Sequence, residues 1–169
     1  MRVGWRIGAV VGIAAFVVVA TPALAHAVAI TVPSSANLGS VPSGTASLSA
    51  QLGQVTATDS GLLGLLPSFT ATVSTTTFTT GSRTAGETIG KASISYWSGP
   101  ITATTGAQTP VPGQATALLA EDLSVARRAF SSSGLVSTIS TSWNPTIIVN
   151  IPAAAVAGTY TGTITHSVA

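Results

Sequence analysis

The sequence contains no cysteine, and only 6% of its 169 residues are charged. Without cysteine the chain has no disulfide framework, no thiolate nucleophile and no cysteine-based zinc site. After position 25 the charged residues are four cationic and four anionic side chains, so this part of the chain is formally neutral. A neutral surface without a basic cluster argues against nucleic acid and anionic wall polymers as charge-driven partners.

The residues from which catalytic sites are built are also scarce. No metal-ligand spacing connects the two histidines, His26 and His166. Glu121 and Asp122 are adjacent, and adjacent residues on a strand point to opposite faces, so they are not a hydrolytic pair. A serine nucleophile would have only those two histidines as bases. We therefore expect no enzymatic activity, no cofactor and no metal site.

The N-terminal segment begins like a secretory signal peptide. Arg2 and Arg6 flank a short polar start, and residues 7–20 follow without a polar side chain. A membrane-spanning helix needs about 20 apolar residues. The 14 residues of this run are too few, which favours a cleaved leader over an uncleaved anchor.

The end of this segment fits a signal-peptidase site. Pro22 ends the apolar run, and small residues follow it up to Ala25. We predict that residues 1–25 are a signal peptide cleaved after Ala25, with Ala27 as the alternative cleavage position. Residues 26–169 would then be one exported domain without a transmembrane span, long enough to bury a core.

Residues 26–169 alternate between apolar and polar side chains in short runs. Runs of period two, filled by β-branched residues and separated by Gly, Pro and Ser, indicate half-buried strands. The predicted strands are residues 28–32, 45–50, 68–78, 91–96, 146–151 and 160–168. Repeated strands favour an all-β fold, an antiparallel β-sandwich of the Greek-key or Ig-like type.

Residues 115–130 fit two structures. Their apolar residues lie at helical spacing and would form one short helix. The alternative, which we favour, is two short strands around an acidic turn at Glu121 and Asp122. The predicted loops are residues 60–68, 81–88 and 106–113.

The end of the chain reads YTGTITHSV, residues 160–168. Tyr160 is followed, after three residues, by Ile164 and Thr165, and then by His166 and Val168 with one residue between them. This spacing resembles the distal motif of the WxL domain family of Gram-positive cell-surface proteins. In that motif Trp-x-Leu follows the same Tyr, aliphatic and Thr positions. His166 stands at the Trp position, and Val168 stands at the Leu position.

A second segment resembles the proximal motif of the same family. In SFTATVS, Phe69 stands at the Trp position and Ala71 at the Leu position. Residues 52–61 resemble the family's segment before that motif, and residues 141–162 resemble its run into the final strand. The resemblance covers nearly all of residues 26–169.

The resemblance implies a secreted β-sandwich that attaches noncovalently to the cell wall, with peptidoglycan as the expected partner. An indole offers a wide apolar face that stacks on a sugar ring or fills a pocket. Phe69 keeps a smaller version of that face, whereas His166 is planar and can hydrogen-bond. If the motif positions bind the wall, this chain binds more weakly or binds something else. If they are core positions, Phe69 and His166 are alternative fillers.

Five residues are candidates for a binding site: Phe69, Trp97, Tyr160, His166 and Val168. For His166, apolar neighbours at period two favour a buried neutral imidazole with a lowered pKa and one or two hydrogen bonds; the alternative is a ligand contact. Tyr160 is expected to be structural, like the tyrosine of a tyrosine corner. Trp97 either is exposed and stacks on carbohydrate or packs under a loop, which we favour.

Three other residues receive structural predictions. Asp59, in TDSG, is expected to form an Asx turn. Lys91 is expected on a solvated face. Trp143 shares its parity with Ile147 and is expected to pack in the core or at the edge of the sandwich.

Three functional hypotheses follow. The first is a WxL-like wall-binding module. It lacks an LPxTG sorting motif, so we expect noncovalent retention. The second is a structural subunit whose exposed strand edges pair with copies or with another surface protein. The third is a secreted carbohydrate-binding module that uses Trp97 or Phe69.

Overall fold

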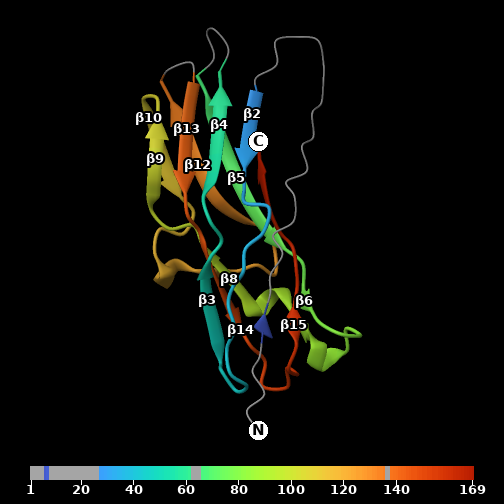
Figure 1. Ribbon diagram of the computed structural model, residues 1–169. Helices are drawn as coiled ribbons and strands as arrows, with labels where there is room; N and C mark the ends of the chain where they lie inside the picture. Colours follow the sequence, from blue (N-terminus) through green and yellow to red (C-terminus); the bar gives the residue numbers. More distant parts are fainter. Residues whose placement is uncertain (1–5, 8–26, 62–65, 136–137) are drawn as a thin grey trace.

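The computed structural model describes residues 6–7, 27–61, 66–135 and 138–169 (Figure 1). Of the predicted signal peptide, only β1 (Arg6–Ile7) lies within these ranges, and it pairs in parallel with β15 (Thr159–Tyr160). The rest of the leader and the cleavage position after Ala25 lie outside the described residues. As predicted, the described residues form an all-β fold in which antiparallel four-stranded sheets pack as a β-sandwich. No helix among them is long and apolar enough to cross a membrane.

One layer of the sandwich consists of three long strands that each break once, with one further segment at an edge on each side of the breaks. Its segments are β2 (Ala27–Thr31), β3 (Ser47–Gln51), β4 (Val55–Ser60), β8 (Ile94–Trp97), β9 (Ile101–Thr105), β11 (Glu121–Asp122), β13 (Thr138–Trp143) and β14 (Thr146–Asn150). On one side of the breaks the strand order is β11-β8-β14-β3, and on the other side it is β9-β13-β4-β2. Because β8 leads into β9, β3 into β4 and β13 into β14, the two groups form one long bent layer (Figure 1).

Glycine and proline mark the breaks. Gly53 and Gly99 have φ angles of 94° and 75°, in the left-handed region that side chains rarely adopt. Pro145 has no N–H for a sheet ladder, and its carbonyl accepts the Leu52 N–H at 2.9 Å across the break. The three strands therefore change direction together and stay paired on both sides.

The opposite layer contains β5 (Ser68–Thr75), β10 (Gln108–Pro112), β12 (Arg127–Gly134) and β16 (Ile164–Val168), in the order β10-β12-β5-β16. The register of β12 against β5 shifts between Arg128 and Phe130, which marks a β-bulge. Before the bulge the odd residues face inward, and after it the even residues do. Ala129 and Phe130 are therefore both buried although they are adjacent.

The prediction that residues 106–113 form a loop was wrong, because β10 occupies most of them and pairs with β12. The prolines that suggested a loop, Pro110 and Pro112, lie on an edge strand. An edge strand tolerates proline where the missing N–H would point outward, away from the ladder. The same two prolines remove donors from the free edge and so hinder edge-to-edge association.

The structure decides between the two alternatives for residues 115–130. Glu121 and Asp122 form β11, which pairs with β8, and β12 begins at Arg127. The only helical part is the single 3₁₀ turn η3 (Ala117–Leu119). The two-strand alternative is confirmed, with one correction: the acidic pair lies on the first strand, and the turn follows it.

Two other predictions differ in detail. Residues 91–96 were expected to be one strand, but Lys91–Ser93 form a 3₁₀ turn, η2, before β8 starts at Ile94. Ala92 is therefore exposed rather than inward, whereas Lys91 is exposed as predicted.

The predicted loops 60–68 and 81–88 connect strands. Residues 62–65 of the first lie outside the described ranges. The second contains the 3₁₀ turn η1 (Ala85–Glu87) and joins β6 (Phe78–Thr79) to β7 (Thr88–Ile89). Both regions join strands much as the sequence predicted.

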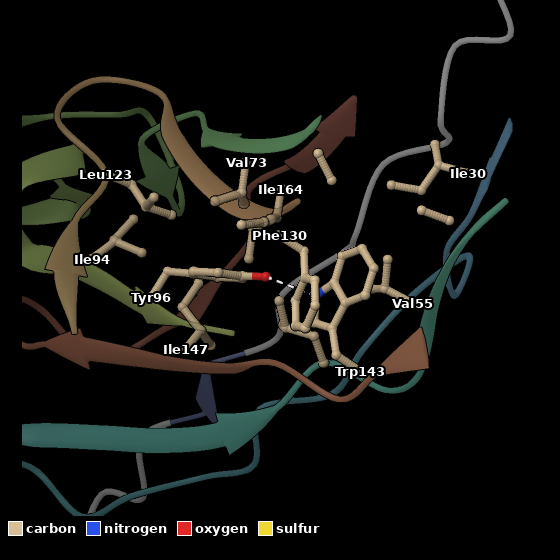
Figure 2. Packing of buried hydrophobic residues seen from close by; sticks show 14 of the residues in the cluster. Ile30, Val55, Val73, Ile94, Tyr96, Leu123, Phe130, Trp143, Ile147 and Ile164 are labelled. Atoms are coloured by element: carbon tan, nitrogen blue, oxygen red, sulfur yellow. Dashed lines mark hydrogen bonds between the residues drawn. The ribbon is translucent and has the colours of Figure 1, made fainter. Parts of the chain in front are cut away.

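The core lies between the two layers and follows the predicted alternation (Figure 2). Trp143, predicted to pack in the core or at the edge of the sandwich, is fully enclosed. At the centre of the core, the Phe130 ring stacks on the Trp143 indole, with ring centroids 4.9 Å apart and ring planes at 23°. The largest fully buried side chains are Trp143, Tyr96, Tyr160, Phe78 and Phe130.

Tyr160 has the structural role that the sequence predicted. Its phenol O–H donates to the carbonyl of Val156, four residues back, at 3.0 Å, and to that of Gly86 at 2.8 Å. Gly86 belongs to η1, and its carbonyl also accepts the Val156 N–H at 2.9 Å. Tyr160 therefore ties the β14–β15 connection to the β6–β7 loop.

We expect Tyr160→Phe to lower the free energy of unfolding by about 1–2 kcal/mol, because two carbonyls lose a buried donor while the ring stays in place. Chemical denaturation followed by far-UV circular dichroism measures this loss. Thr159→Ala, at the exposed neighbouring position, is the control and should stay within about 0.5 kcal/mol of the parent. Equal effects for the two variants would contradict the role of the phenol.

Candidate functional site

The five residues predicted for binding do not form one surface. Phe69, Tyr160 and His166 are buried, with exposed fractions of 3%, 0% and 4%. Val168 is half-buried and packs against the core, and Trp97 is half-buried on β8. The structure brings Phe69, His166 and Val168 together on the paired strands β5 and β16, and places Tyr160 and Trp97 on other strands.

His166 belongs to a buried polar chain that links the two layers. The Tyr96 hydroxyl lies 3.2 Å from His166 Nε2. The Trp143 Nε1–H donates to the same hydroxyl oxygen at 3.2 Å (Figure 2). The three side chains come from β8, β13 and β16. The rings also pack together, with the His166 centroid 5.7 Å from that of Tyr96 and 6.4 Å from that of Trp143.

The donors in this chain determine where the protons lie. An indole N–H can only donate, so the Tyr96 oxygen accepts from Trp143 and the Tyr96 O–H is left to donate to His166 Nε2. His166 is then a neutral imidazole with its proton on Nδ1. Within the described residues, Nδ1 has no hydrogen-bond partner.

Burial explains the ionisation of both residues. Desolvation lowers the pKa of His166 from 6.5 to about 4, because no anion is present to compensate an imidazolium. Desolvation also raises the pKa of Tyr96 far above its usual value, and the Trp143 N–H offsets only part of this effect. Both groups are therefore neutral near pH 7, as the sequence predicted for His166.

Chemically, this arrangement is suited to packing rather than to catalysis. A general base needs access to a substrate proton, but His166 is enclosed by core side chains. The chain Trp143–Tyr96–His166 instead satisfies polar atoms where the layers meet.

Trp97 packs under a loop, as we favoured from the sequence. An added Cβ on Gly99 would lie 3.5 Å from Trp97 Cζ3, so the indole is in contact with the chain at the break between β8 and β9. The loop is held by Gln114, whose carbonyl accepts from the Ser98 hydroxyl at 2.9 Å and from the Gly99 N–H at 3.1 Å.

The acidic pair on β11 is engaged with neighbouring side chains. Arg127 lies 3.7 Å from the Glu121 carboxylate and 3.5 Å from that of Asp122. Gln114 Nε2 donates to Glu121 at 2.6 Å. Hydrogen bonds from Ser124 lower the pKa of Asp122. These contacts stabilise the turn before β12 and provide no paired carboxylates across a cleft.

Asp59 lies inside β4 rather than in the predicted Asx turn. It is fully buried, and its Oδ2 accepts the Ser68 N–H at 2.7 Å. The strand continues past Asp59 because Ser60 still pairs with Ala27 and Thr138. Asp59 therefore fixes the start of β5 relative to the end of β4.

Two shallow hollows lie on the surface of the described residues. One, of about 430 Å³, overlies β5, β10 and β12, and its lining is mostly serine and threonine. The other, of about 460 Å³, lies where β6 meets residues 161–163, and it is lined by Thr76, Thr77, Thr79, Arg83, Thr161, Gly162 and Thr163. Within the described ranges, no three His, Asp or Glu side chains are close enough to hold a metal ion.

The second hollow was not predicted from the sequence, although its lining is rich in threonine. Residues 74–78 of this region lie in the strand predicted for residues 68–78, and no site was predicted there. Its meeting with residues 161–163 depends on the bridge between Thr79 and Thr161, which joins segments about eighty residues apart.

Comparisons with known proteins add no relative: no protein-family model, no curated protein and no solved structure matches the chain.

Proposed function

We propose that residues 26–169 are an exported, non-catalytic domain of WxL type that binds noncovalently to cell-wall peptidoglycan. One observation carries the proposal. The two segments that resemble the proximal and distal motifs are neighbouring strands, β5 and β16, and the two residues at the Leu positions, Ala71 and Val168, are direct partners in the register. These two segments are almost a hundred residues apart in the sequence, yet they are paired in the sheet, as expected for two motifs that act together.

The burial of the motif residues assigns them a role in the fold. Phe69 and His166, at the two Trp positions, are only 3% and 4% exposed, although Phe69 borders the hollow over β5, β10 and β12. We therefore expect a wall glycan to bind at the surface, where the two hollows are lined by hydroxyl side chains. Hydroxyl groups donate and accept hydrogen bonds and so suit the hydroxyl groups of a glycan.

The test is co-sedimentation of the protein comprising His26 to Ala169 with purified peptidoglycan. We expect the protein to pellet, and the pelleted fraction to change by less than about twofold between about 0.05 M and 0.5 M salt, since this part of the chain is neutral. Trp97→Ala should pellet like the parent, because the indole is partly covered. A parent protein that stays in the supernatant would refute wall binding.

A steep loss of pelleting with salt would indicate charged contacts instead. Loss of pelleting for Trp97→Ala alone would favour the carbohydrate-binding module that stacks on this indole. These two outcomes separate the proposed function from its closest alternative.

A second candidate function, assembly with another surface protein or with copies, is favoured by the edge of β16. Ala169 and Thr70 exchange N–H···O bonds of 3.1 and 2.8 Å, so the odd residues of β16 bond to β5. The backbone groups of Ile164, His166 and Val168 then point away from β5, at the edge of the sheet. Such an edge can accept an added strand. Light scattering over a concentration series would reveal the oligomers that this function requires.

A further inference from the structure

The hollow at β6, which we call the threonine groove, is formed by a fixed backbone. Its residues are Thr76, Thr77, Thr79, Arg83, Thr161, Gly162 and Thr163. Thr79 and Thr161 exchange two N–H···O bonds, both of 2.9 Å, and the Thr163 N–H donates to Thr76 Oγ1 at 2.9 Å. Gly162 has no room for a side chain, because an added Cβ would overlap the Phe78 ring at 2.0 Å. The floor of the groove is therefore set by core packing.

The hydroxyl groups along this floor are available to a ligand. Thr76 is engaged, since its Oγ1 donates to the Thr77 carbonyl at 3.1 Å. Within the described residues, the other four hydroxyls make no hydrogen bond to the protein; they belong to Thr77, Thr79, Thr161 and Thr163. Each can donate one hydrogen bond and accept others.

Arg83 adds one positive charge to the groove. Its φ of 64° makes it the only non-glycine residue of the described chain in the left-handed region. The turn is held by the Arg83 N–H, which donates to the Thr80 carbonyl at 3.1 Å. Its guanidinium makes no ion pair or hydrogen bond within the described residues. A strained backbone that presents an unpaired cation is a feature that functional sites retain.

The acid of the same loop does not neutralise Arg83. Glu87 Oε2 accepts the Thr84 N–H at 3.0 Å and the Thr84 hydroxyl at 2.8 Å. These hydrogen bonds lower the pKa of Glu87 and hold its carboxylate against its own loop. No acidic side chain lines the groove.

We infer that the threonine groove binds a carboxylated, hydroxyl-rich sugar, with Arg83 on the carboxylate and the four threonines on the sugar hydroxyls. A guanidinium matches the two oxygens of a carboxylate. One cation suits isolated carboxylates, whereas a chain of closely spaced phosphates would require several. The volume of about 460 Å³ lies within the range of about 300–1,000 Å³ typical of small-ligand sites.

This inference rests on the proposed wall binding and specifies where on the domain a glycan would bind. The carboxylate has two sources, the lactyl group of muramic acid, which is free in peptidoglycan only where the stem peptide has been removed, and the uronic acids of other polysaccharides. The experiment uses a probe for each.

The experiment is a two-dimensional NMR titration of residues 26–169 with three disaccharides. The first is N-acetylglucosaminyl-N-acetylmuramic acid, the second is chitobiose, which lacks the lactyl carboxylate, and the third is a uronic-acid disaccharide. We expect saturable shifts at the amides of Thr77, Thr79 and Thr161 with the first, and affinity weaker by about tenfold or more with chitobiose. Comparable binding of the uronic-acid probe would indicate that any sugar carboxylate suffices.

Arg83→Gln removes the charge of Arg83 and keeps a shorter, unbranched polar side chain at the same backbone position. We expect it to weaken binding of the muramic acid disaccharide by about tenfold, whereas Lys91→Gln, which removes an exposed cation outside the groove, should not. Equal affinity for chitobiose, unchanged binding by Arg83→Gln, or shifts elsewhere on the surface would overturn the inference.

The two proposals can fail separately. Pelleting with whole peptidoglycan but no shift at the groove would leave wall binding in place and reject the threonine groove. Shifts at the groove without pelleting would support the groove and reject peptidoglycan as the polymer.

Discussion

Acidification from about pH 7 to about pH 4 is expected to lower the free energy of unfolding by about 3 kcal/mol through His166 alone. The pKa of His166 is 6.5 in the unfolded chain and about 4 in the fold. Below pH 6.5, His166 therefore binds a proton in the unfolded chain but stays neutral in the folded chain until the pH approaches 4. The contribution of His166 is complete above its unfolded pKa and is lost as the pH falls towards its folded pKa.

The contacts of His166 explain why the fold resists protonation. An imidazolium would donate from both nitrogens, but Nε2 faces a Tyr96 hydroxyl that already donates to it, and Nδ1 faces no acceptor among the described residues. Denaturant titrations at several pH values measure the loss. Exposed carboxylates with lowered pKa values, on Glu87 and Asp122, also weaken the fold in acid, so variants are needed to isolate His166.

His166→Phe and His166→Gln are the two informative variants. Both remove the titrating group. The loss of unfolding free energy between about pH 7 and about pH 4 should therefore be smaller in these variants than in the parent by about 3 kcal/mol. His166→Gln can still accept from Tyr96 and provides a second test if the Phe variant folds poorly. His26→Gln removes the other histidine and should keep the parental dependence. A parental slope in both His166 variants would contradict the prediction.

The strand alternation and the core were accessible from the sequence because burial of one sheet face leaves a period of two in the residues. Parity alone favoured packing in the core or at the sandwich edge for Trp143 and burial for His166. Parity cannot tell which inward residues will touch, because contact across the layers depends on register and on the break in each long strand. The hydrogen-bonded chain of Tyr96, Trp143 and His166 is therefore visible only in the structure.

The errors have physical reasons as well. Pro110 and Pro112 suggested a loop because proline is excluded from central strands, but edge position is a property of the whole sheet. Asp59 suggested a turn because short polar side chains compete for local backbone donors. Asp59 lies on β4, and its Oδ2 accepts the Ser68 N–H, nine residues away.

The candidate functional residues were likewise only partly predictable from the sequence. The motif resemblance led to Phe69 and His166, and the structure makes both part of the packing between β5 and the other layer. The threonine groove was not predicted, because its two sides are distant in the sequence and meet through hydrogen bonds between residues 76–79 and residues 161–163. A surface site built from common residues leaves no spacing signal in a single sequence.

Trp143→Ala is expected to be the most destabilising single change, with a loss of about 3–5 kcal/mol in the free energy of unfolding. The indole is fully buried, stacks on Phe130 and donates a hydrogen bond to the Tyr96 oxygen. Its truncation leaves a large cavity where the two layers meet. A domain of this size is stable by about 5–15 kcal/mol, so the variant should be close to unfolding at moderate temperature.

Trp143→Phe separates packing from hydrogen bonding at the same position. Phenylalanine can still stack on Phe130 but has no N–H, so we expect an intermediate loss of about 2 kcal/mol. Trp97→Ala, which truncates a half-buried indole, is the matched control and should cost less than Trp143→Phe. Far-UV circular dichroism in denaturant compares all three without depending on tryptophan fluorescence. A loss for Trp143→Ala no larger than that for Trp97→Ala would mean that the contact of Trp143 with Phe130 and Tyr96 does not hold the two layers together.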